Sequence, residues 1–323
     1  MRIDGVGIEA VFGCVPSRAV DNLAALTPLV GDEKAAAIMQ ATGFKTRRVA
    51  PEGTDVMDLM LPAARCALDG VRPNEVGGVI AVSFSGRDRF PAAAARMQNA
   101  LGLSKEVAAF DISMACSGWI YGLFSAAQLV KACGRKVLLV DGDVQSAWID
   151  CADANTLAVM GDGATATLLA PGSASWEFAF LTDGSGADVL KCRDRISMDG
   201  FGVFRFVAGP VRRFLERFLM ESRILAGAEP VFVPHQANMY IVRQLAEALG
   251  LKGNLAGCGE KYANTGSCSA ALTLAAGGGR FAGTSLTDSG QALPVLLAGF
   301  GAGLSAGAAA TELGAFRKGV VEA

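Results

Sequence analysis

The chain has 323 residues, of which 51% are hydrophobic and 40 are glycine, so it can bury a large core and exceeds the usual size of one simple domain. Its 29 basic and 31 acidic residues nearly balance, which excludes a global field that would attract nucleic acid. No run of Lys or Arg predicts a polyanion-binding arm. An anionic partner must therefore be held by a local patch.

The N-terminal segment carries charges at Arg2, Asp4 and Glu9 and has no uninterrupted apolar run, so we expect neither a signal peptide nor a membrane span there. The eight cysteines form no C-x-x-C pair, and the chain has a single histidine. This pattern excludes the familiar zinc spacings and predicts free thiols in a reducing compartment. We therefore expect a cytoplasmic protein with no metal, no cofactor and no membrane partner.

Apolar runs alternate with Ala-rich, helix-like segments, which is the pattern of strands covered by helices in an α/β protein. Most of the apolar runs are continuous, as expected for strands buried on both faces. In chain order, the elements predicted are strand 76–83, helix 117–134, strand 136–144, strand 164–170, helix 211–224, strand 230–236, helix 239–250 and strand 293–301.

The order of elements is repeated in the two halves of the chain. FDISMACSG is followed by a helix, a VLLVDGD strand and GDGATATLLA, and KYANTGSCS is followed by a helix, an LPVLLAGFG strand and GAGLSAGAAAT. Two copies of one plan predict a pseudo-twofold axis that brings Cys116 and Asn264 to one central site. The Pro/Gly/Ser stretch at 170–175 predicts the boundary between an N-terminal half, 1–171, and a C-terminal half, 172–323.

Cys116 is a candidate nucleophile. It stands between a strand-like segment and the helix that starts with Ser117 and Gly118, where the helix dipole and unpaired N–H groups favour a thiolate. A thiolate is the state that nucleophilic catalysis needs. Cysteines are also common buried packing residues, and position alone leaves that the more frequent role.

His235 follows an apolar strand and Pro234, at a strand end that in open α/β sheets tends to face a ligand crevice. Asn264 precedes an Ala-rich helix, where capping is as good an interpretation as chemistry. The glycine clusters at 161–166 and 299–307 lack the G-x-G-x-x-G spacing of a dinucleotide loop. They indicate close approach of the backbone to a substrate or a neighbouring element.

Six segments together resemble the β-ketoacyl-ACP (acyl carrier protein) synthase III family of the thiolase superfamily. They occur in family order and span nearly the whole chain, at 42–50, 111–123, 159–170, 232–238, 262–267 and 296–307. The resemblance implies an α/β thiolase-like fold, with two duplicated halves in a five-layered α-β-α-β-α arrangement, and a homodimer. It also implies an acyltransferase that starts fatty-acid chains in lipid metabolism.

By this resemblance, Cys116 accepts an acyl primer as a thioester. His235 and Asn264 then hold the thioester oxygen of malonyl-ACP, which stabilises the enolate formed as CO₂ leaves. The carbanion attacks the acyl-cysteine and gives a 3-oxoacyl-ACP. The tetrahedral oxygen is expected to be held by the N–H of Cys116 and by one from the loop of Gly301, Ala302 and Gly303.

Further residues are implied outside the catalytic centre. Asn238 is expected among the substrate-binding residues, and Phe90 matches the position that reaches across the dimer to close the partner's acyl pocket. The surface that binds the carrier protein is basic in the family, and four arginines could supply it: Arg205, Arg212, Arg213 and Arg217. The alternative for these arginines is a solvated helix face, and Tyr240 and Glu247 replace residues that are commonly basic there.

The chain departs from the family where relatives hold the adenine of CoA between a tryptophan and an arginine. Ala37 and Ala154 stand at those places, so an acyl-ACP donor, or CoA bound differently, joins acyl-CoA as an alternative carrier of the primer. Arg87 and Arg89 lie beside Phe90 near the expected acyl pocket. We expect them to point to solvent, although they could select a primer with a second carboxylate.

Competing functions depend on the same residues. A degradative thiolase needs a second catalytic cysteine in the loop 299–307, which has none, and a hydroxymethylglutaryl-type synthase needs an acid that we cannot place. A secondary-metabolism condensing enzyme of the same fold, with a non-standard primer or acceptor, has identical machinery. An inactive partner or carrier-docking subunit is disfavoured because Cys116, His235 and Asn264 are all present.

Overall fold

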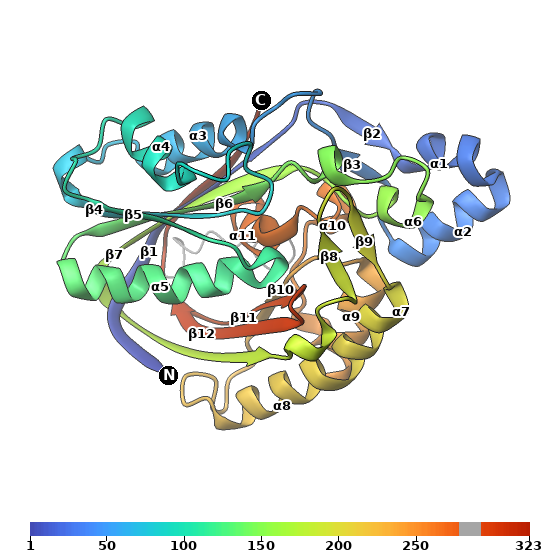
Figure 1. The fold of residues 1–323 in the computed structure, drawn as a ribbon. Coiled ribbons are helices and arrows are strands. Elements are labelled where there is room, and N and C mark those ends of the chain that lie inside the picture. The colour runs from blue at the N-terminus through green and yellow to red at the C-terminus, as the bar shows by residue number, and fades with distance from the viewer. Residues whose placement is uncertain (278–291) are drawn as a thin grey trace.

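Two long strands, β1 (Arg2–Val15) and β7 (Gly163–Thr182), organise the fold of this computed structural model, which describes residues 1–277 and 292–323. They pair antiparallel along almost their whole length, and nine strands of the described residues join through them into one mixed sheet. Both strands curve, so the sheet doubles over and its two ends lie in separate layers (Figure 1).

The other strands of this sheet are β4 (Val76–Val82), β5 (Ala108–Ile112), β6 (Lys136–Asp143), β10 (Val231–Pro234), β11 (Leu293–Gly301), β12 (Ser305–Leu313) and β13 (Arg317–Glu322). Two small ribbons pair β2 (Ala19–Asp21) with β3 (Thr46–Arg48) and β8 (Leu190–Cys192) with β9 (Ile196–Met198). The predicted strands 76–83, 136–144, 230–236 and 293–301 are confirmed as β4, β6, β10 and β11.

Strand order is the same in the two halves of the chain. In the first half, β4 runs parallel to β6, β6 is antiparallel to residues 163–169 of β7, and β7 is antiparallel to β1. In the second half, β10 runs parallel to β11, β11 is antiparallel to β12, and β12 is antiparallel to residues 176–182 of β7. The predicted duplication of one plan is therefore confirmed.

The stretch at 170–175, where the sequence predicts the boundary between the two halves, lies inside the continuous strand β7. Pro171 still pairs with Val6 of β1, next to a register shift at which β7 has extra residues, and such irregularities accommodate a residue without an N–H. The predicted strand 164–170 is thus only the first part of β7. The neighbour of β7 changes here from β6 to β12, and the chain passes from one layer to the other within a single strand.

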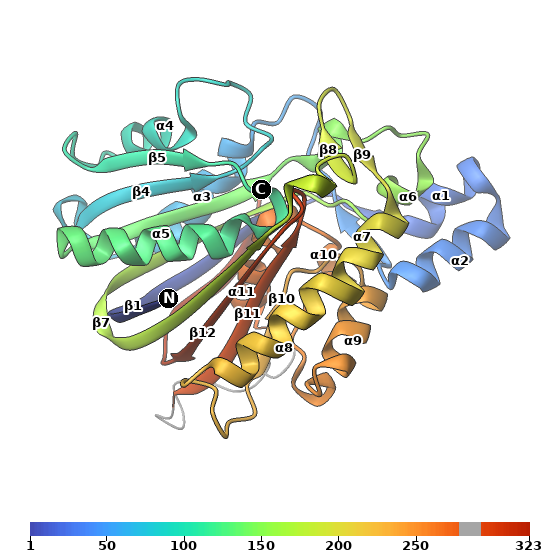
Figure 2. The ribbon, with the colours of Figure 1, turned by 60° about the horizontal axis from the view of Figure 1, so that its bottom comes forward.

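Helices occupy three layers around the two sheet layers (Figures 1 and 2). Separate apolar clusters pack α3 and α4 on the outer face of the first layer, α5 and α11 between the layers, and α8 and α9 on the outer face of the second. This confirms the five-layered α-β-α-β-α arrangement. The bounds are α3 (Val56–Ala67), α4 (Ala93–Ala100), α5 (Gly118–Cys133), α11 (Ser269–Ala276), α8 (Arg212–Glu221) and α9 (Met239–Ala248).

The remaining helices lie around these layers and are α1 (Asn22–Val30), α2 (Asp32–Thr42), α6 (Ala154–Leu157), α7 (Gly200–Phe206) and α10 (Gly259–Tyr262). The predicted helix 211–224 ends earlier, at Glu221, and continues from α7 through a π-helical turn, Val207–Val211, that contains Pro210. Across the described residues, none of the helices combines the length and apolarity that a membrane crossing requires.

Helix α5 is apolar on more than one face because it is covered by both sheet layers. Trp119, Leu123 and Val130 are buried in the cluster shared with β6 and β11, and the indole N–H of Trp119 donates to Thr167 Oγ1 at 3.2 Å. A Cβ at Gly122 would lie 2.7 Å from a methyl of Leu139, so glycine lets the helix approach the sheet closely. This packing fixes the helix that directly follows the turn of Cys116.

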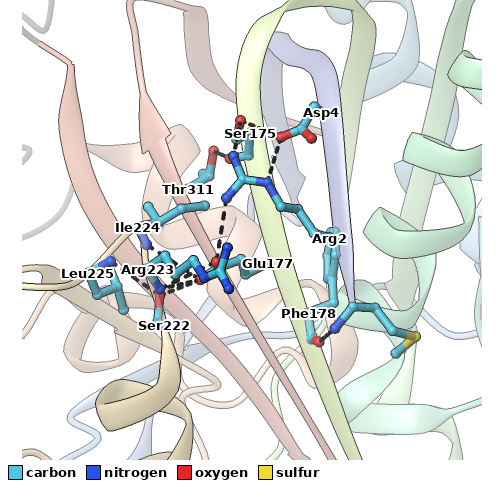
Figure 3. Close-up of polar contacts among 11 residues, drawn as sticks. Arg2, Asp4, Ser175, Glu177, Phe178, Ser222, Arg223, Ile224, Leu225 and Thr311 are labelled. Atoms are coloured by element: carbon cyan, nitrogen blue, oxygen red, sulfur yellow. Dashed lines mark hydrogen bonds and ion pairs between the residues drawn. The ribbon is translucent and has the colours of Figure 1, made fainter.

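A polar network joins the N-terminal strand to the second half of the chain (Figure 3). Arg2 bonds Asp4 and Ser175 at 2.9 and 3.1 Å and forms an ion pair with Glu177 at 3.6 Å. Glu177 accepts hydrogen bonds from Ser222 Oγ at 2.6 Å and from the N–H of Arg223 at 3.0 Å. Its side chain is only 13% exposed, so it holds the chain after α8 against β7.

Replacing Glu177 with alanine is expected to lower the free energy of unfolding by about 1–3 kcal/mol, because the Ser222 hydroxyl and the Arg223 N–H lose a charged acceptor. Thermal unfolding should report a melting temperature lower by several degrees. Glu221, the exposed last residue of α8, provides the matched control. Equal melting temperatures for the Glu177→Ala and Glu221→Ala proteins would contradict this role.

Candidate active site

Cys116 lies in a tight turn between β5 and α5. The residue before it, Ala115, has φ of 43°, a left-handed conformation that a residue with a Cβ adopts at an energetic cost. Ser117 donates a hydrogen bond from Oγ to the carbonyl of Met114 at 3.0 Å and closes the turn. The thiol therefore stands at the N-terminal end of α5, where the sequence predicts it.

The glycine-rich loop after β11 closes over this turn. A Cβ built on Gly301 would lie 2.9 Å from the Cβ and 3.3 Å from the Sγ of Cys116. Ser305 donates from Oγ to the carbonyl of Ala302 at 2.7 Å, and its Oγ also lies 2.7 Å from the Oγ of Ser117. These contacts hold the backbone of the predicted oxyanion loop beside the thiol, and Gly303 lies within the same loop with φ of 137°.

A Gly301→Ala protein is expected to acylate Cys116 at least ~10-fold more slowly, because the added methyl displaces the thiol from its position. The rate of adduct formation, followed by intact-protein mass spectrometry, measures this directly. A methyl group added at Gly314 would meet no atom within 4 Å, so Gly314→Ala is the control for a harmless glycine replacement. Unchanged acylation in both proteins would show that the loop can move away.

His235 follows β10 and is only 2% exposed. Its Nδ1 lies 2.8 Å from Ser269 Oγ, and that oxygen also accepts the N–H of Gln236 at 3.0 Å. Burial lowers the pKa of His235 from 6.5 to about 4, while a backbone hydrogen bond at Gly266 acts in the opposite direction. The imidazole is therefore neutral at neutral pH, with one ring nitrogen oriented by Ser269.

Asn264 caps a turn through its oxygen and keeps an amide hydrogen available through its nitrogen. Its Oδ1 accepts the N–H of Gly266 at 2.9 Å, which caps the turn before α11. Its Nδ2 donates to the carbonyl of Ala237 at 3.4 Å, and since an amide nitrogen carries two N–H groups, the second is left for a ligand among the described contacts. Gln145 Nε2 fixes the backbone by donating to the carbonyl of Asn264 at 2.7 Å.

The structure brings the three candidate residues to one place at the centre of the fold. Phe300 lies between two glycines that contact the Cys116 turn, and its ring meets the edge of the His235 ring with centroids 5.5 Å apart. Gln145 bonds the backbone of Asn264 and lines the same pocket as Cys116. The predicted convergence of residues from the two halves is thus present in the packing.

The thiol does not have the low pKa that its place at a helix end predicts. Burial, with a smaller contribution from the carboxylate of Asp143, raises the pKa of Cys116 to about 12. Asp143 accepts hydrogen bonds from Ser83, Phe84 and Ser85, and burial raises its own pKa to about 6. The helix end is outweighed by the partial loss of water around the cysteine, so the group is a thiol at neutral pH.

Several polar residues of this site had no signal in the sequence. Ser117 and Ser305 are in contact across 188 positions, and Ser269 orients a histidine that lies 34 positions before it. Asp143 is the last residue of β6, whose middle is apolar, and Gln145 begins the short turn that follows it. Only the fold places them around the reacting groups.

The pocket that contains the Cys116 thiol has a volume of about 440 Å³. Ala302 and Cys116 both line it, and its larger apolar lining residues are Phe84, Trp148, Met160, Leu190 and Ile196. Arg87 and Arg89, expected to point to solvent, are exposed but also line this pocket. Their placement was therefore only half predicted.

The peripheral residues are distributed around this pocket. Phe90 is 86% exposed in the single chain. A side chain that contacts a partner subunit would have such exposure when the partner is absent. Asn238 caps α9 by accepting the N–H of Ile241 at 2.8 Å. Ala37 is exposed on α2 and Ala154 is buried at the start of α6, and in the described part of the chain neither lines the pocket of the thiol.

The four arginines of the expected carrier patch are all exposed on α7 and α8, whose other faces bury Phe214, Leu215 and Phe218. One is engaged with a carboxylate, since Arg212 bonds Glu216 at 2.7 Å, and Arg205 lies over the ring of Phe201 at 5.4 Å. The set Arg205, Arg212, Arg213 and Arg217 therefore forms a basic surface on one side of the molecule.

The duplicated five-layered fold, with a cysteine, a histidine and an asparagine at its centre, defines a thiolase-like condensing enzyme of the acyltransferase class. Two family models match the chain, 3-oxoacyl-[acyl-carrier-protein (ACP)] synthase III over residues 110–184 and its C-terminal model over residues 229–313. The β-ketoacyl-[acyl-carrier-protein] synthase III of Geobacillus kaustophilus is 30% identical over 317 residues, which cover 96% of this chain and 99% of that protein. The chain belongs to the β-ketoacyl-ACP synthase III family, as its sequence motifs predict.

Solved structures agree with this assignment. A 3-oxoacyl-(acyl-carrier protein) synthase from Burkholderia xenovorans superposes with a TM-score of 0.92 at 27% identity and covers 100% of this chain and 98% of that chain. The priming β-ketosynthase of the R1128 polyketide biosynthetic pathway superposes with a TM-score of 0.83 at 29% identity and covers 97% of each chain. Both likenesses extend over the whole fold.

Proposed function

We propose that this protein condenses an acyl primer, carried on Cys116, with malonyl-ACP to give a 3-oxoacyl-ACP and so initiates fatty-acid synthesis. The observation that supports this most is the meeting of Cys116, from the first half of the chain, with His235 and Asn264 from the second. A nucleophile and two hydrogen-bonding groups at one buried centre suit a reaction in two half-steps.

In the first half-step, the Cys116 sulfur attacks the carbonyl carbon of the primer thioester. The new sulfur–carbon bond replaces the bond to the carrier, and the thiol proton leaves on the carrier sulfur, so the exchange is balanced. The N–H groups of Cys116 and Ala302 hold the tetrahedral oxygen. The high pKa of the buried thiol means that proton removal must accompany the attack.

In the second half-step, malonyl-ACP loses CO₂ and the resulting carbanion attacks the acyl carbon. The bond from that carbon to Cys116 Sγ breaks, and the released sulfur takes up one proton from solvent. Ser269 accepts the Gln236 N–H, so its own hydroxyl proton can go to Nδ1 of His235, which leaves Nε2–H as a donor. The Nε2–H and the free N–H of Asn264 stabilise the enolate oxygen. A neutral imidazole suits this role, because its N–H can donate to the enolate oxygen without a change in its own charge. The surrounding groups then need not rearrange as the enolate forms.

The surroundings of the site supply the proposed partners. The exposed arginines on α7 and α8 would bind the acidic carrier protein, with Asn238 close to the entering arm, and Phe90 would close the acyl pocket of a second copy in a homodimer. Ala37 and Ala154 offer no clamp for adenine, which favours an acyl-ACP donor or CoA held in another way. Eight free cysteines suit a cytoplasmic enzyme.

Intact-protein mass spectrometry after incubation with a panel of acyl-CoA and acyl-ACP donors tests this function. A mass increase equal to one acyl group identifies the primer and its carrier. Subsequent addition of malonyl-ACP should release a 3-oxoacyl-ACP. If no donor forms an adduct, the alternative of a non-catalytic partner subunit is favoured instead.

The likeness to the R1128 priming β-ketosynthase supports a second candidate, a condensing enzyme of secondary metabolism with the same machinery. The same panel distinguishes the two. A primer or acceptor outside ordinary fatty-acid synthesis, used in preference to acetyl donors and malonyl-ACP, would select the second candidate.

A further inference from the structure

The pocket of the thiol is positively charged although the chain as a whole is not. Four cations line it, and no Asp or Glu of the described residues does: Arg87, Arg89, Lys191 and Arg193, called here the rim cations. The net charge of the chain is −2, so these cations are concentrated locally. Two come from the loop after β4 and two from the β8–β9 ribbon, so the charge is assembled by the fold.

Two of the rim cations are already engaged. Arg87 donates to the carbonyl of Gly53 at 2.8 Å, and Lys191 pairs with Asp188 at 2.7 Å. Arg89 and Arg193 have neither a hydrogen bond nor an ion pair within 4 Å among the described residues. Asp88, the acid adjacent to Arg89, is paired with Arg96 at 3.5 Å instead. Two guanidinium groups are thus left for an anion that enters the pocket.

The rim cations are separate from the basic surface proposed for the carrier protein. The arginines of that surface lie on α7 and α8, and none of them lines the pocket. His235 and Asn264, which would receive the malonyl group, do not line it either, whereas Cys116 does. The pocket therefore faces the acyl chain bound to sulfur and not the arm that delivers it.

We infer that the pocket is built for a primer with a carboxylate at its far end, a dicarboxylic acyl thioester. The inference rests on the proposed function. An acyl chain attached to Cys116 would lie along the apolar wall of Phe84 and Leu190, and its terminal carboxylate would reach Arg89 and Arg193. Guanidinium groups bind carboxylates through two parallel hydrogen bonds, which a neutral methyl end cannot form.

The chemistry at sulfur is unchanged by this primer. The bond between Cys116 Sγ and the acyl carbon forms, the bond to the carrier sulfur breaks, and the thiol proton moves to that sulfur. The distal carboxylate takes no part in bond making. The rim cations are thus specificity-determining residues, and they act on which primer is chosen.

The test compares donors of equal chain length on the same carrier, succinyl with butyryl and glutaryl with valeryl. The wild type is expected to acylate Cys116 about tenfold faster, in kcat/KM, with the dicarboxylic member of each pair. An Arg89→Gln/Arg193→Gln protein should lose this preference and keep its rate with butyryl and valeryl donors. Arg195→Gln, on the same ribbon but outside the pocket, is the control and should keep it, since Arg195 bonds Ala147.

Two outcomes overturn the inference. Equal rates for the two members of each pair in the wild type would remove the dicarboxylic primer. If the double variant loses acylation rate equally with all four donors, Arg89 and Arg193 would instead bind the phosphodiester of the pantetheine arm that carries the primer. High salt should weaken the preference in parallel, because the rim is exposed.

A second readout separates this inference from the proposed function. Free glutarate should slow alkylation of Cys116 by iodoacetamide more than valerate does, and the double variant should lose this protection. If no donor acylates the protein but glutarate still protects, the proposed condensation fails and the inferred anion site stands. If neither occurs, both fail.

Discussion

Replacing Cys116 with alanine is expected to abolish the acyl adduct and to slow condensation by at least ~10³-fold, because the covalent intermediate can no longer form. The cysteine lies where the turn after β5, the helix α5 and the loop after β11 meet, so a neighbouring thiol cannot take its place. Intact-protein mass spectrometry measures the adduct, and the yield of 3-oxoacyl-ACP measures turnover.

Cys192 provides a demanding control for this result. It is exposed and lines the same pocket, but it belongs to the β8–β9 ribbon and not to a helix start. A Cys192→Ala protein should form the adduct at the wild-type rate. Transfer of the acyl group to Cys192 in the wild type, or survival of the adduct in Cys116→Ala, would disprove the assignment of the nucleophile.

Loss of either hydrogen-bonding partner should separate the two half-steps. His235→Ala and Asn264→Asp are each expected to reduce condensation by about 10²–10³-fold while Cys116 is still acylated, since both groups act on the malonyl thioester. Aspartate at 264 keeps an oxygen for the N–H of Gly266, so the turn stays capped while the donor to the enolate is lost. Adduct formation and CO₂ release are measured separately.

The Ser269→Ala protein serves as the comparison for this pair. Ser269 does not face the substrate in this scheme but orients His235 through Nδ1, so its loss should cost less than loss of the ring itself. A fall in acylation equal to the fall in condensation, in either His235→Ala or Asn264→Asp, would instead assign that residue to activation of the thiol.

Much of the fold could be predicted because its strands are continuous apolar runs. β4 and β6 are buried at nearly every position, and the matched order of motifs in the two halves revealed the duplication before any contact was known. The end of β7 was missed because Pro171 and Gly172 indicate a break, whereas pairing to a curved β1 keeps the strand intact. Local composition does not contain that long-range pairing.

The candidate site was predictable in its main residues and not in its electrostatics. Cys116, His235 and Asn264 stand out because each sits at the junction of a strand or loop with a helix. The state of the thiol depends instead on how completely α5 and β11 remove it from water and on the nearby Asp143. Arg89 likewise lines the pocket together with the β8–β9 ribbon, which is distant from it in the sequence.

The path of β7 has a consequence for how the molecule unfolds. One continuous strand supplies hydrogen-bonding edges to both layers, through β6 at its start and β12 at its end. Either half, without the other, would leave part of this strand as an open edge and would uncover the central helices. We therefore expect the duplicated halves to behave as one cooperative unit that melts in a single transition, with the reacting centre lost only when the whole protein unfolds.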